Sequence, residues 1–214
     1  MSTNKNISLI ELAETIADNK YILGDRLVEV GISGPNLEAT LSAVAMAQQE
    51  LGHARLIYRW AFELKGLNGN RVDIKDQTGK AYKSNVEITN WIDLIAGLYV
   101  TNIATDIVMK AVIAAEHPEV NPPFSKMLKE QNEHTIYSKS WCRQLVQEKG
   151  SIPRRFHEAL TKQFEEASQW LRKIEQDPLL QSEKMVQHNG DLSKQLKDKV
   201  EVFLQKGVVS NVNG

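Results

Sequence analysis

Apolar residues recur three or four positions apart along most of the chain, the spacing that places them on one face of a helix. Asn36 precedes the second apolar segment as a helix N-cap, and Gly66 follows that segment as a C-cap. Thr89 is expected to cap the third segment. The pattern predicts four long helices, over residues 7–33, 36–66, 90–116 and 124–149.

The polar segment 67–87 separates the second and third predicted helices, and it contains either a small hairpin or a short extra helix. Further helices are expected over residues 154–175, from Asp177 onwards and over 191–206. Four long helices with one long crossover are typical of a ferritin-like bundle, and an up-down bundle with a decorated loop is the alternative. We therefore predict an all-α, ferritin-like four-helix bundle with additional C-terminal helices.

The expected organisation is a single helical domain with short flexible ends. It comprises a flexible N-terminus (1–6), one ferritin-like domain (7–206) and a flexible tail (207–214). Within the domain, residues 7–149 form the core bundle and residues 151–206 the C-terminal helices.

Composition narrows the class of protein. The 214 residues are 42% hydrophobic and 25% charged, which suits a globular domain and not a disordered one. Lys and Arg number 26 against 27 Asp and Glu, so the basic excess of a nucleic-acid-binding protein is missing. A single cysteine, Cys142, excludes an intrachain disulfide. No apolar run of about 20 residues is apparent, so we expect a cytoplasmic protein without membrane contact.

The segment AQQELGHAR (residues 47–55) carries the most informative polar pair. Glu50 and His53 are three positions apart, so they share one face of the second helix with an apolar stripe. Glu-x-x-His pairs hold dinuclear iron or manganese in ferritin-like bundles. A hydrogen-bonded pair without metal is the alternative, because burial of these groups without partners is costly.

A dinuclear carboxylate site needs two Glu-x-x-His pairs and two further carboxylates. The other helices offer Glu29, Asp106 and His134, but Gln131 stands three positions before His134 where a glutamate is expected. Glu130 precedes His134 by four positions. Amides bind iron more weakly than carboxylates because they bring no charge to offset that of the cation.

Three segments resemble the phenylacetyl-CoA monooxygenase A/C subunit family, the PaaA and PaaC proteins of the ferritin-like superfamily. They are NKYILGDRLVEVGISGPNLE, AMAQQELGHARLIYRW and LKEQNEHTIYS, and the resemblance covers roughly residues 15–145. It implies one of two subunit types. The A type is a di-iron oxygenase that epoxidises the ring of phenylacetyl-CoA, and the C type is its structural partner, which has lost the metal site.

The resemblance places the six ligand positions of the A type on Glu29, Glu50, His53, Asn102, Gln131 and His134. Asn102 and Gln131 are amides, so these two positions are degenerate. Asp106 lies one turn after Asn102 and Glu130 one residue before Gln131, where either can supply a missing carboxylate. The candidate metal ligands are thus Glu29, Glu50, His53 and His134, with Asp106 or Glu130.

Two functions stay open. The favoured one is a structural or interaction subunit of a multicomponent aryl- or acyl-CoA ring monooxygenase, bound to a homologous ferritin-like subunit or to itself. The alternative is a catalytic non-haem oxygenase subunit with one or two iron ions, which acts on phenylacetyl-CoA or a related acyl-CoA and takes electrons from a reductase. Iron is therefore either the cofactor or absent.

Overall fold

A computed structural model describes residues 6–67, 77–116, 124–185 and 191–205. Every regular element in these residues is a helix, so the all-α prediction is confirmed. The elements are α1 (Ile7–Glu29), a 3₁₀ turn η1 (Gly31–Ser33), α2 (Leu37–Leu64), α3 (Lys83–Val86), α4 (Trp91–Ala114), α5 (Phe124–Leu145), α6 (Ile152–Gln176), α7 (Pro178–Ser182) and α8 (Leu192–Leu204).

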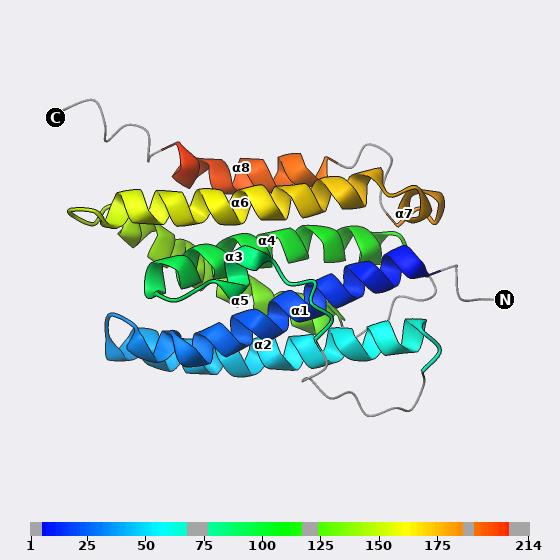
Figure 1. Ribbon diagram of the computed structural model, residues 1–214, viewed down its shortest axis with the longest axis horizontal. Coiled ribbons are helices and arrows are strands. Elements are labelled where there is room, and N and C mark those ends of the chain that lie inside the picture. Colours follow the sequence, from blue (N-terminus) through cyan, green and yellow to red (C-terminus); the bar gives the residue numbers. More distant parts are fainter. Residues whose placement is uncertain (1–5, 68–76, 117–123, 186–190, 206–214) are drawn as a thin grey trace.

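The long helices form two pairs that face each other. α1 lies along α2, α5 packs on α4, and α1 also contacts α4 (Figure 1). The connection from α2 to α4 is long and carries α3, which agrees with the short extra helix considered as one alternative. This arrangement is consistent with a ferritin-like bundle.

Helix ends follow the expected capping residues with two differences. Asn36 Oδ1 accepts a hydrogen bond from the Ala39 backbone N–H, and Gly66 has a positive φ of 75° after α2. The third long helix is capped by Asn90 and not by Thr89. The first ends at Glu29 rather than at residue 33, because the chain turns where Gly31 packs closely against Ala43.

The C-terminal helices build a second layer on α4. α6 buries Phe156, Leu160 and Leu171 against it, and α8 adds Leu196 and Phe203. Figure 1 shows α6 and α8 side by side, on the opposite side of α4 from α2. The predicted flexible ends lie almost entirely outside the described residues.

α4 is apolar on nearly all sides, because it is covered by α1, α5, α6 and α8. Contrary to the sequence-based expectation, it is long and apolar enough to cross a membrane. Within its most apolar window, 89% of the residues are buried inside the bundle. A helix covered on nearly all sides in this way is a core helix of the bundle.

A buried carboxylate fastens the connection after α2 to α1. Asp18 accepts hydrogen bonds from the Tyr58 hydroxyl, from the backbone and hydroxyl of Thr78, and from the Lys80 backbone N–H. Glu166 of α6 accepts the backbone N–H groups of Lys83 and Ser84 at the start of α3. Residues 78–84 of the connection are therefore held by one carboxyl group of α1 and one of α6.

Candidate functional site

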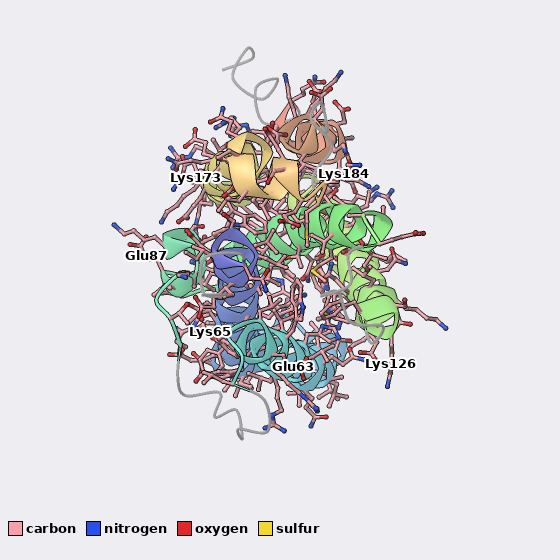
Figure 2. All side chains as sticks on the ribbon, turned by 90° about the vertical axis from the view of Figure 1, so that its right-hand side faces the viewer. Glu63, Lys65, Glu87, Lys126, Lys173 and Lys184 are labelled. Atoms are coloured by element: carbon pink, nitrogen blue, oxygen red, sulfur yellow. The ribbon has the colours of Figure 1, made fainter. Side chains whose placement is uncertain are left out.

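A layer of polar side chains crosses the centre of the bundle and divides its apolar core into two clusters. On α1, Lys20 lies between Ile16 of one cluster and Leu23 of the other. On α2, Glu50 lies between Ala47 and Ala54 in the same way. Seen end-on, α1, α2, α4 and α5 lie around the centre of the bundle (Figure 2).

The centre of the layer is an ion pair between α1 and α2. Lys20 Nζ lies 2.9 Å from Glu50 Oε2, and both side chains are 0% exposed. Lys20 also donates a hydrogen bond to Asn102 Oδ1 of α4, at 2.5 Å. Burial of either charge alone would cost several kcal/mol, so each requires the other.

The second carboxylate oxygen of Glu50 contacts side chains of two further helices, α4 and α5. Oε1 accepts a hydrogen bond from Asn102 Nδ2 at 3.1 Å and lies 2.7 Å from His134 Nδ1 of α5. The other ring nitrogen of His134 lies 2.6 Å from Gln49 Oε1, so the imidazole is held from both sides. Glu50 thus joins residues from all four long helices of the bundle.

Asn102 uses both ends of its amide in this network. Its oxygen accepts from Lys20 while its nitrogen donates to Glu50. An aspartate at this position has no donor for Glu50 and adds a second negative charge beside it. The amide therefore suits an ion pair at the centre of the bundle better than a carboxylate does.

Gln131 and His53 complete the layer with one unpaired atom each. Gln131 Nε2 donates to the Asn102 carbonyl oxygen at 3.0 Å, and its Oε1 has no hydrogen-bond partner. His53 Nε2 lies 2.9 Å from Glu130 Oε2, and its buried Nδ1 also has no partner. The His53 and His134 ring centroids are 6.0 Å apart.

The pKa shifts in the layer follow from burial and from Lys20. Burial acts to raise the pKa of Glu50, but Lys20 and His134 outweigh it and hold that pKa well below its usual range. Burial lowers the pKa of Lys20, and Glu50 offsets part of this effect. Burial, together with the charge of Lys20, also lowers the pKa of His53. The hydrogen bond from His53 lowers the pKa of Glu130 despite the opposing desolvation.

The structure brings six of the eight candidate positions together, counting Asn102, and gives the other two different partners. Glu50, His53, Glu130, Gln131 and His134 meet in the layer with Asn102. Glu29 lies on the surface, 62% exposed, with Oε2 2.6 Å from Arg26 Nη1. Asp106 pairs with Lys110 at 2.8 Å, and its charge also acts to raise the pKa of Lys20.

Lys20 is the functional residue that sequence reasoning missed. It lies four residues after Ile16 and three before Leu23, so it occupies a core position of the apolar stripe on α1. A charge at such a position predicts a buried partner. Glu29 is nine residues from Lys20, about 2.5 helical turns, and therefore points to the opposite face of α1.

The family resemblance implies a metal ion, which would need several ligand side chains grouped around one point. Among the described residues, no three His, Cys, Asp or Glu side chains are grouped so that they could hold a metal ion. The carboxylate best placed for the task, Glu50, is bound by the ammonium group of Lys20. As arranged, the side chains therefore do not fit a metal ion.

A comparison with protein-family models matches residues 1–210 to the phenylacetic acid catabolic protein family. The chain belongs to this family. A comparison with curated proteins gives no match. The match spans nearly the whole chain, so the resemblance seen over residues 15–145 extends through the C-terminal helices α6 and α8.

The ion pair predicts a specific pattern of stability in this member of the phenylacetic acid catabolic family. Lys20→Met leaves Glu50 buried without its cation and is expected to lower the free energy of unfolding by about 3–5 kcal/mol. Lys20→Met/Glu50→Gln removes both charges and is expected to recover most of this loss. Urea unfolding at pH 7.5 measures both effects.

Lys65→Met serves as the control, because it removes a partly exposed partner of Glu14 and should cost about 1 kcal/mol or less. A loss below about 1 kcal/mol for Lys20→Met, or no recovery in the double variant, would contradict the account.

The lowered pKa of His53 predicts acid sensitivity. The folded state binds a proton at His53 less readily than the unfolded state, whose histidines titrate near 6.5. The free energy of unfolding should therefore fall as the pH drops from 7.5 to 5.5, with His53 contributing up to about 1.4 kcal/mol per pH unit. The free energy of unfolding is measured by urea unfolding at each pH and expressed relative to its value at pH 8. It is expected to fall less steeply with decreasing pH in His53→Gln than in the native protein. An undiminished slope in the variant would refute this assignment.

Proposed function

We propose that this protein is an interaction subunit of a multicomponent monooxygenase that acts on an aryl- or acyl-CoA. In this proposal the ammonium group of Lys20 takes the place of the metal at the centre of the bundle. The proposal rests on membership of the phenylacetic acid catabolic family and on one observation, the buried Lys20–Glu50 pair.

The charges of the layer support a role without metal. Lys20 and Glu50 neutralise each other, and the amide of Asn102 satisfies both of them. An ion bound by Glu50 must displace Lys20 from its acceptors, which leaves a buried ammonium group without partners. Lys20 therefore supplies the positive charge that a bound metal ion supplies in a carboxylate metal site.

The proposed partner is a ferritin-like subunit that carries out the oxidation. That subunit, and not this chain, would bind iron, the acyl-CoA and the reductase. The mostly buried α4 suits a soluble complex, and we propose a cytoplasmic one.

A second candidate function is favoured by the side chains around His53. Glu50, His53, Glu130 and His134 lie in one layer, and His53 Nδ1 is buried without a partner. If Lys20 moved away, Glu50 and the two imidazoles would be ligand types that suit iron. This alternative is a catalytic oxygenase subunit with one or two iron ions.

Bound metal distinguishes the two functions. The chain is made with iron and manganese available, purified without a metal-affinity tag, and analysed before and after anaerobic reconstitution with ferrous iron. We expect less than about 0.1 metal ion per chain in both samples, because Lys20 already compensates Glu50.

Glu50→Ala and His53→Ala are the matched controls for that analysis. One or two iron ions per native chain, lost in both variants, would overturn the proposed function and favour the catalytic one. Metal that persists in both variants is bound elsewhere and would leave the assignment of Lys20 intact.

A further inference from the structure

The outer face of α2 is exposed along its length. Successive residues three or four apart on this face are Leu37, Leu41, Val44, Gln48, Gly52, Arg55 and Arg59. Leu37 is 74% exposed, Leu41 61% and Val44 40%, although leucine and valine usually lie inside a protein. The face extends for about 33 Å along the helix.

Two other sides of α2 contact the rest of the chain. Leu51 packs closely on Gly24 and Tyr58 donates to Asp18, so one side of the helix faces α1. Gln49 and His53 reach residues of α5 on the other side. The outer face lies between these two sides and turns away from the bundle, with α2 at its lower edge in Figures 1 and 2.

Gly52 is not required by close packing among the described residues. A Cβ atom at this position would meet nothing within 4 Å, and the residue is in the middle of a helix. Glycine there costs about 1 kcal/mol relative to alanine. A glycine on an outer helix face does, however, leave room for a side chain of a second molecule.

The face is complementary to itself when two copies run antiparallel. The spacing of its residues reads the same in both directions from Gln48, so a two-fold axis at Gln48 places Val44 against Gly52 of the second copy. The same axis places Leu41 against Arg55 and Leu37 against Arg59. Leucine then packs on the aliphatic part of arginine, and valine fills the space above glycine.

Charge favours the same orientation. Glu38 lies in the first turn of α2, beside the exposed leucines, while Arg55 and Arg59 lie in its second half. In the antiparallel arrangement Glu38 of each copy comes level with Arg59 of the other, which gives two attractive pairs per dimer. A parallel arrangement brings like charges together.

We propose that the outer face of α2, residues 37–59, binds the same face of a second copy of this chain, antiparallel and with Gln48 on the two-fold axis. The inference goes beyond the proposed function, because it adds a second copy of this chain to the catalytic subunit proposed above. Its test does not involve metal, so it stands or fails separately from the assignment of Lys20.

A cysteine on the axis tests the geometry directly. Two helices in contact bring residues on the axis within the Cα–Cα range of a disulfide, about 4.4–6.8 Å. Gln48→Cys is therefore expected to form a covalent dimer on mild oxidation of the otherwise complete protein. Gln195→Cys is the control, because this glutamine is exposed on α8, on the other side of the molecule. The native Cys142 is buried and should not compete.

The strength of association is measured by sedimentation over about 1–100 μM chain. The native protein is expected to dimerise, and Leu41→Glu to dissociate at least about 100-fold more readily, because each dimer carries the change twice and each is worth at least tenfold. Circular dichroism checks that the exposed substitution leaves the helices intact. Arg59→Glu should weaken the dimer, and Glu38→Arg/Arg59→Glu should restore it.

Three results would overturn the inference. They are a native protein that stays monomeric at 100 μM, a dimer that Leu41→Glu does not weaken, and cross-linking of Gln48→Cys no greater than that of Gln195→Cys. Association with a different chain alone would also overturn the inference, because the native protein would then stay monomeric by itself.

Discussion

The buried ion pair between Lys20 and Glu50 is the interaction on which the rest of the bundle depends. Neither charge can stay inside the core alone, so α1 and α2 must bring them together. Glu50 then reaches α4 through Asn102 and α5 through His134. Four helices are thus held in one register by a single carboxylate, and the apolar clusters above and below this layer pack around that register.

This arrangement bears on what the protein does. Ferritin-like metal centres gather carboxylates, whose mutual repulsion is relieved when a metal binds. Here the fully buried carboxylate of Glu50 is neutralised by the ammonium group of Lys20, and the amides of Asn102 and Gln131 add hydrogen bonds without charge. Under the proposed function, folding requires no cofactor, and the chain acts through its surfaces. The exposed leucines of α2 are then explained by association with another molecule, because they make no contribution to the core of their own chain.

Much of the fold was predictable because helical periodicity repeats many times over each long helix. The capping of α2 by Asn36 followed from residue type alone. Residue type did not distinguish Thr89 from the adjacent Asn90, and Asn90 is the residue that caps α4. The meeting of Glu50 with His134 was implied by the family resemblance, whereas the shared helix face concerned only Glu50 and His53. Lys20 was missed because spacing within one helix does not reveal which partner a neighbouring helix presents. Glu29 was included on resemblance, although the helical turn places it opposite to Lys20.

The most direct test of the central claim is a crystal structure of the native protein grown with ferrous iron, with anomalous data collected at the iron edge. We expect Lys20 Nζ within about 3 Å of Glu50 and Asn102, as a charge-assisted hydrogen bond requires, and no anomalous peak in the polar layer. An iron peak beside Glu50, His53 and His134, with Lys20 turned away from Glu50, would contradict the account.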